Sequence, residues 1–182
     1  MNRINYILPE CYVDTNLINV LVDGMCNHKK GCATVCKSLD NEFSERFAIA
    51  VIDKDKREPK QVANFSLLME SDGLVVLKQK TRPHFLIEIN PAIETFILNA
   101  VNELNVSLSD YNIPSDINAL KRLTKSVNVK ESEVFARLFK DLRNATNFVK
   151  LRKIIKYLCE KQYGASAEDL LHYCKHENLV TN

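Results

Sequence analysis

The sequence predicts an α/β fold with a mostly parallel sheet flanked by helices, followed by a C-terminal all-helical segment. Patterns typical of strands alternate with patterns typical of helices up to about residue 105. The run 47–53 is short, apolar and bounded by charges, which is typical of a strand buried on both faces of a parallel sheet. From Ser115 onward, apolar residues recur only at helical spacing. These observations divide the chain into an α/β domain over residues 1–110 and a basic helical module over residues 111–182.

Five segments rich in aliphatic and β-branched residues are predicted as strands. In chain order they are residues 3–9, 32–37, 47–53, 74–79 and 84–89. Because helices are expected between them, most neighbouring strands should run parallel, and the third should be central.

Three helices are predicted in the same part of the chain. Asp14 or Thr15 is suited to cap the first, because apolar residues follow at helical spacing. A second helix is expected over residues 59–69, beginning at a proline. Pro91 is suited to be the first residue of a third helix, which continues over residues 92–104.

The helical module is strongly basic. Its predicted helices cover residues 116–127, 131–144, 146–161 and 166–177. Residues 121–161 contain twelve Lys or Arg against four Asp or Glu. Lys150 and Lys153 lie opposite an apolar stripe, so they are candidates for contacts to a nucleic-acid backbone. The alternative is the ordinary solvated face of an amphipathic helix.

Composition narrows the class of protein. With 46% hydrophobic and 26% charged residues and no apolar run of membrane-spanning length, we expect a soluble cytoplasmic protein without membrane partners. The N-terminus lacks the pattern of a signal peptide. The six cysteines are expected to be reduced thiols. Two groups could indicate zinc, but their spacing is not that of paired ligands: Cys26, His28, Cys32 and Cys36, and Cys159, His172, Cys174 and His176.

Acidic residues follow the first and third predicted strands. Glu10 ends the first strand and Asp14 lies four residues later, whereas Asp53 and Asp55 end the third. If these strands are neighbours, the four carboxylates meet at one edge of the sheet, where ligands of α/β proteins collect. Such a concentration of negative charge is unfavourable unless cations neutralise it, and carboxylates suit Mg²⁺ or Mn²⁺.

The order of strand, Glu10-x-x-x-Asp14, helix, then apolar strand and Asp53-x-Asp55 resembles the Toprim domain, over about residues 3–105. Residues 91–98 are similar to the helix that follows the sheet in small OLD-like and RloB-like members. The resemblance implies a metal-dependent nuclease, a hydrolase acting on DNA or RNA. It also implies phage defence as the biological setting.

The resemblance also assigns roles to residues. Glu10, Asp53 and Asp55 would be catalytic, and the same three would hold Mg²⁺ or Mn²⁺ with Asp14 and Glu94. Three basic residues after the third strand would neutralise phosphate charge. They are Lys54, Lys56 and Arg57.

One departure from the family pattern leaves a second interpretation open. The family has glycine after its first Glu, where this chain has Cys11. A catalytically degenerate, Toprim-like scaffold acting with a partner protein would explain that change. Assembly into a homo-oligomer is left open separately. A flavodoxin-like or receiver-type domain also carries acidic strand ends, but the sequence lacks a well-placed phosphoacceptor Asp with a strand-end Lys downstream.

Overall fold

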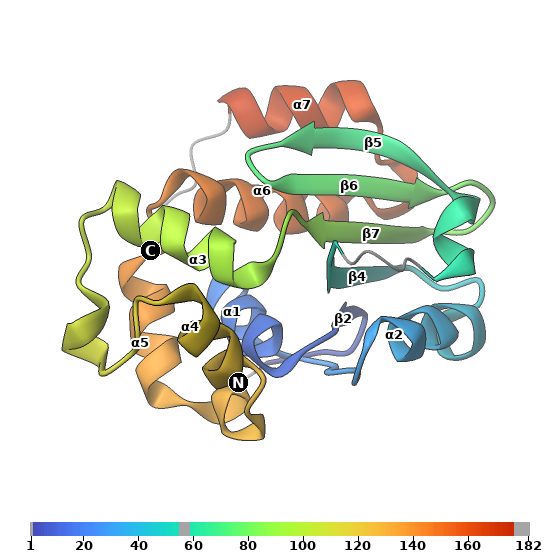
Figure 1. The fold of residues 1–182 in the computed structure, drawn as a ribbon. Coiled ribbons are helices and arrows are strands. Elements are labelled where there is room, and N and C mark those ends of the chain that lie inside the picture. Colours follow the sequence, from blue (N-terminus) through green and yellow to red (C-terminus); the bar gives the residue numbers. More distant parts are fainter. Residues whose placement is uncertain (1, 55–58, 177–182) are drawn as a thin grey trace.

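A computed structural model describes residues 2–54 and 59–176 as a mixed α/β fold (Figure 1). The strands in these residues are β1 (Asn2–Ile4), β2 (Ile7–Pro9), β3 (Gly24–Cys26), β4 (Ala48–Asp53), β5 (Phe65–Ser71), β6 (Leu74–Gln79) and β7 (His84–Ile89). The α-helices are α1 (Tyr12–Leu21), α2 (Cys32–Ser38), α3 (Ile93–Glu103), α4 (Ile117–Thr124), α5 (Glu133–Asp141), α6 (Thr146–Lys161) and α7 (Ala167–His176). The shorter helical turns are η1 (Leu39–Phe43), η2 (Lys60–Asn64), η3 (Leu108–Tyr111), η4 (Val127–Glu131) and η5 (Gln162–Gly164). None of the helices in the described residues has the length and apolar character needed to cross a membrane.

The main sheet is mixed. Across the described residues it has five strands, in the order β2-β4-β7-β6-β5. β4 pairs in parallel with both β2 and β7, whereas β6 is antiparallel to both of its neighbours. The predicted parallel pairing therefore applies to the part of the sheet that contains the acidic strand ends. β1 and β3 form a separate parallel pair.

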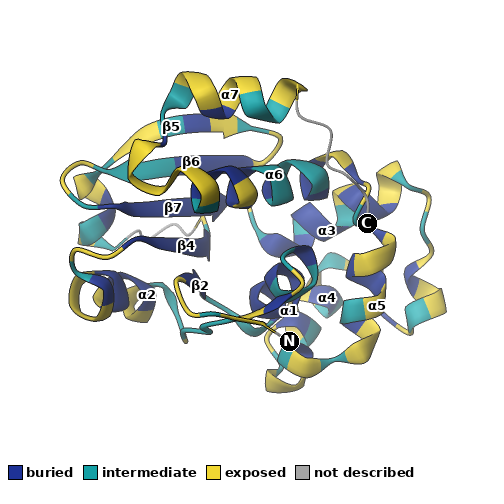
Figure 2. Ribbon diagram, turned by 180° about the vertical axis from the view of Figure 1, so that it is seen from behind, coloured by how far each residue is buried: buried dark blue, intermediate teal, exposed yellow. Residues whose placement is uncertain are grey.

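Alternate residues of β4 face two hydrophobic clusters, which is why this strand is apolar throughout. Ile49 and Val51 pack with residues of α1, α3 and α6, whereas Ala50 and Ile52 pack with residues of α2 and η1. Figure 2 shows β4 and β7 as buried strands between these layers. Complete burial of each large aliphatic side chain contributes about 1.5–3 kcal/mol.

Two helices of the C-terminal part, α5 and α6, join the core formed with α3. Phe96 of α3 stacks on Phe148 of α6 with 5.4 Å between ring centroids, and Phe148 also contacts Phe139 of α5 at 6.1 Å. One buried cluster contains residues from both sides of the predicted boundary at residue 110. Two separate folding units at that boundary stay a prediction.

Three predicted elements differ from the structure. Residues 32–37 form α2 instead of a strand, because Val35 and Leu39 recur at helical spacing and pack on the sheet. The helix expected over residues 59–69 is replaced by η2 and the edge strand β5, since pairing with β6 overrides local spacing. Residues 3–9 divide into β1 and β2, which belong to different sheets.

A glycine connects the β5–β6 turn to the segment that leads into α3. Gly73 has a φ of 76°, in the left-handed region. Its carbonyl accepts a hydrogen bond from the Asn90 amide at 2.8 Å, and a Cβ at this position would lie 3.0 Å from the Asn90 oxygen. The backbones of Gly73 and Asn90 can therefore approach this closely because glycine has no side chain.

Candidate functional site

Glu10 and Asp53 lie at the carboxyl ends of adjacent parallel strands. β2 and β4 pair with Pro9 opposite Val51, which confirms that the first and third predicted strands of the sheet are neighbours. The Glu10 amide donates to the Val51 oxygen at 2.9 Å. The Asp53 amide lies 3.4 Å from Oε2 of Glu10, toward which it donates. The two acids therefore meet at one edge of the sheet.

Asp14 belongs to the first turn of α1 and is completely buried. The Cys11 amide donates to its Oδ2 at 3.2 Å, while Oδ1 has no hydrogen-bond partner among residues 2–54 and 59–176. The helix begins earlier than predicted, at Tyr12, so Asp14 is not its cap. Asp14 lies inside the first turn, where negative charge is favourable. A buried carboxylate oxygen without a partner is costly.

Glu94 and Asp53 meet at the beginning of α3. The Ile93 amide donates to Oδ1 of Asp53 at 3.0 Å. Glu94 is buried, and its Oε1 accepts a hydrogen bond from the Thr124 hydroxyl at 2.6 Å. This helix begins two residues after Pro91 and not at it. The first turns of α1 and α3 thus both contribute to the site.

The four carboxyl groups influence one another. We call Glu10, Asp14, Asp53 and Glu94 the acidic cluster. Burial, with the nearby Glu10 and Glu94, raises the pKa of Asp14 to about 7. Burial raises the pKa of Asp53 to about 8, with further contributions from Asp14, Glu94 and Glu10. Because like charges share a poorly solvated site, the cluster favours the uptake of protons or cations.

The acidic cluster opens into a cavity of about 260 Å³. Glu10, Asp53 and Glu94 line it together with two exposed lysines, Lys30 and Lys125. Anionic and cationic side chains therefore face the same space. That combination suits a phosphate held beside a carboxylate-bound cation.

Sequence reasoning missed several residues at this cavity. His28 stacks on Tyr12 with 4.7 Å between ring centroids, and its Nδ1 lies 2.8 Å from the Thr15 hydroxyl. Burial and the positive charge of Lys130 lower the pKa of His28, which favours the neutral ring. Thr124 comes from the distant α4. No local pattern marks these residues, because their role depends on which loops the fold brings together.

The donor chemistry of the acidic cluster fits Mg²⁺ or Mn²⁺, which prefer carboxylate oxygens. The buried Oδ1 of Asp14, which has no hydrogen-bond partner among the described residues, is an oxygen that a cation would satisfy. In the part of the chain that the structure describes, however, no three or more His, Cys, Asp or Glu side chains are arranged to hold a metal ion together. Asp55, Lys56 and Arg57 lie outside the described residues.

Cys11 has a structural role at the beginning of α1. Its Sγ accepts a hydrogen bond from the Asp14 amide at 3.4 Å, so Cys11 and Asp14 form a reciprocal capping box. Burial, with the negative charge of Asp14, raises the pKa of the thiol. A protonated thiol is a capping group and not a nucleophile here.

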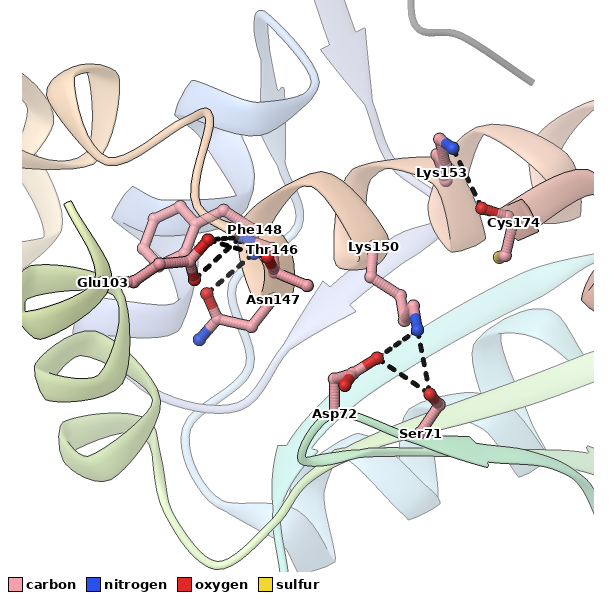
Figure 3. A network of polar contacts seen from close by, with 9 residues as sticks. All are labelled: Ser71, Asp72, Glu103, Thr146, Asn147, Phe148, Lys150, Lys153 and Cys174. Carbon is pink, nitrogen blue, oxygen red and sulfur yellow. Dashed lines mark hydrogen bonds and ion pairs between the residues drawn. The ribbon is translucent and has the colours of Figure 1, made fainter. Parts of the chain in front are cut away.

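The predicted nucleic-acid contacts have different surroundings. Lys54 is exposed next to the acidic cluster. Figure 3 shows Lys150 directed to Ser71 and Asp72, with Nζ 2.9 Å from the Ser71 hydroxyl, and Lys153 directed to the Cys174 oxygen at 2.9 Å. These contacts connect α6 to the β5–β6 turn and to α7. Either lysine would exchange an intramolecular partner for phosphate, so their predicted role stays a prediction.

Comparisons with known proteins add no family to these observations. No protein-family model, curated protein or solved structure matches the chain. The Toprim resemblance rests on the acidic residues that follow β2 and β4 and on the helix that carries Glu94.

Proposed function

We propose that this chain performs divalent-metal-dependent phosphodiester chemistry on nucleic acid, as a Toprim-like nuclease. The observation that carries the proposal is the meeting of Glu10 and Asp53 at the ends of adjacent parallel strands. Asp14 and Glu94 extend the same negative field, which the raised pKa values of Asp14 and Asp53 reflect. Phage defence is the biological setting that the resemblance favours.

The proposed chemistry divides the roles among the described residues. Glu10, Asp14 and Asp53 would hold Mg²⁺ or Mn²⁺, with Glu94 supporting them. A bound divalent cation supplies charge neutralisation and polarisation of a phosphoryl oxygen. Glu10 is only partly buried and lines the cavity, so it would accept a proton from the attacking water. Lys30, Lys54 and Lys125 would offset phosphate charge around the cavity.

Cleavage assays test the proposal. Single- and double-stranded DNA and RNA are incubated with the protein and Mg²⁺, Mn²⁺ or chelator. We expect cleavage only with a divalent ion, and a loss of roughly 100-fold or more in Asp53→Asn and Glu10→Gln. Asp169→Asn, which changes an exposed carboxylate on α7, is the matched control and should retain full activity. No cleavage by the wild type on any polymer, or full activity in Asp53→Asn, would refute a nuclease.

A catalytically degenerate, Toprim-like protein that binds a partner is the second candidate. Two observations favour it: Cys11 at the family glycine is used as a helix cap, and the described residues include no group arranged to hold a metal. A degenerate site predicts that Mn²⁺ leaves the melting temperature unchanged. A nuclease predicts a rise that disappears in Asp53→Asn and persists in Asp169→Asn.

A further inference from the structure

A second cavity lies at the opposite end of β2 from Glu10. Its volume is about 440 Å³, within the range of small-molecule sites. Apolar side chains from β1, β2, α1 and α6 line it, including the buried Ile7 and Ile155. Four charged side chains complete the lining: Asp23, Arg143, Arg152 and Lys156. The cavity thus combines an apolar wall with a mostly cationic one.

Within the part of the chain that the structure describes, the two arginine side chains of this cavity have no acceptor. Nε of Arg152 is buried without a hydrogen-bond partner, and neither Arg143 nor Arg152 forms an ion pair within residues 2–54 and 59–176. Burial lowers the pKa of Arg152, and the neighbouring Arg143 lowers it further. A buried N–H without an acceptor and two adjacent like charges are both unfavourable.

The lining has an excess of positive charge. With three cationic side chains and one carboxylate, its net charge is +2. Lys156 is exposed and lies 3.8 Å from the Glu160 carboxylate, so among the described residues the arginines are the lining cations without an ion-pair partner. Asp23 is exposed at the end of α1 and acts on Arg152 only electrostatically. A ligand with about two negative charges would balance this wall.

We propose that this cavity binds a small phosphomonoester, with its phosphate against Arg143 and Arg152 and its apolar body against Ile4 and Val22. A guanidinium group donates two parallel hydrogen bonds to phosphate oxygens, which would satisfy the buried Nε. The apolar body would cover the half-buried side chains of Ile4 and Val22 in the lining. Because the cavity shares no lining residue with the cavity at the acidic cluster, binding requires neither a divalent cation nor nuclease activity.

Calorimetric titration in chelator tests this site, with phenyl phosphate as the probe. Inorganic phosphate supplies the anion without the apolar body, and benzoate supplies a similar body with one negative charge. We expect phenyl phosphate to bind roughly tenfold or more tightly than either. No binding of phenyl phosphate, or equal binding of inorganic phosphate, would overturn the proposal.

Variants locate the binding. Arg143→Gln and Arg152→Lys should each weaken phenyl phosphate binding roughly tenfold or more, since the lysine retains charge but loses the planar fork. Lys161→Gln is the matched control, because this exposed residue lies on the same helix outside the cavity. Unchanged affinity in both arginine variants would exclude this cavity.

One further variant strengthens binding and so cannot be mistaken for unfolding. Asp23 has a φ of 49°, a conformation that asparagine tolerates well. Asp23→Asn removes the only carboxylate among the lining residues described here. Affinity for phenyl phosphate should rise roughly two- to fivefold. Weaker binding in Asp23→Asn, or loss of binding in Asp53→Asn, would refute the assignment.

Discussion

The main-chain amide of Asp53 donates toward the Glu10 carboxylate across 3.4 Å, joining two residues that are 43 positions apart in the chain. The contact follows from the parallel pairing of β2 and β4, which is fixed by buried residues on both faces of β4. The relative position of the two acids therefore depends on the most buried part of the molecule, which is the least able to adjust.

Asp53→Asn should separate stability from metal binding. The amide retains an acceptor for the Ile93 N–H but removes one charge from the acidic cluster. In chelator at about pH 8 the variant should melt at a higher temperature than the wild type, because less like charge is buried. It should also lose the rise in melting temperature that Mn²⁺ gives the wild type. Destabilisation in chelator would contradict this account of the cluster.

The stability of the metal-free protein should fall as pH rises. Asp14 and Asp53 have ordinary pKa values of 3.8 that burial and the other acids raise to about 7 and about 8. The folded state therefore binds more protons than the unfolded state, and this contribution is complete below about pH 4 and lost toward pH 8. Melting in chelator should show a decline of several degrees across that window. Asp53→Asn should flatten the decline, whereas Asp169→Asn should leave it unchanged.

Thr124→Val should destabilise the fold by about 1–3 kcal/mol, because the buried Glu94 carboxyl loses a donor at 2.6 Å. Urea denaturation measures the difference. Thr124→Ser retains the hydroxyl and should recover most of the loss. Equal stability of the valine and serine variants would mean that the hydrogen bond contributes nothing.

Phe148→Ala should cost about 3–5 kcal/mol, since its ring contacts both Phe96 and Phe139. Because the contact with Phe96 crosses the predicted boundary at residue 110, we expect one unfolding transition for the whole molecule, observed by both circular dichroism and fluorescence. Two transitions, of which Phe148→Ala shifts only one, would instead support separate domains.

Cys11→Ser should stabilise the protein slightly, by about 0.5–1 kcal/mol, since serine is a preferred capping residue and its hydroxyl can replace the 3.4 Å contact from the Asp14 amide. Thermal melting detects the difference. A clear loss of stability would show that packing of the larger sulfur matters more than capping.

Strands defined by burial on both faces could be predicted from the sequence. β6 and β7 have the predicted bounds, and β4 differs by one residue, because their apolar runs and charged ends need no partner to be recognised. β5 could not be predicted, since most of its residues are not buried and its conformation comes from pairing with β6. Neither could α2, whose valine and cysteines are typical of strands but whose buried residues recur at helical spacing.

The candidate site was predictable to the extent that it follows strand ends. Glu10 and Asp53 lie where alternating strands and helices lead one to expect them. The hydrogen bond from Thr124 to Glu94 joins residues 30 positions apart on different helices, and no spacing rule relates them. Lys30 and His28 reach the cavity from a loop. In loops, sequence patterns do not show which way a side chain points.

Gly73 lies in a turn outside the acidic cluster, but its backbone contacts Asn90, just before the helix that carries Glu94. The geometry of the acidic cluster therefore depends in part on this turn. A side chain at Gly73 would press on the Asn90 carbonyl, which precedes Ile93 and Glu94 by a few residues, while every carboxylate kept its identity. Variation that impairs the site can therefore arise at a position with no chemistry of its own. Selection on this site would therefore also act on Gly73, which contributes to the site only by having no side chain.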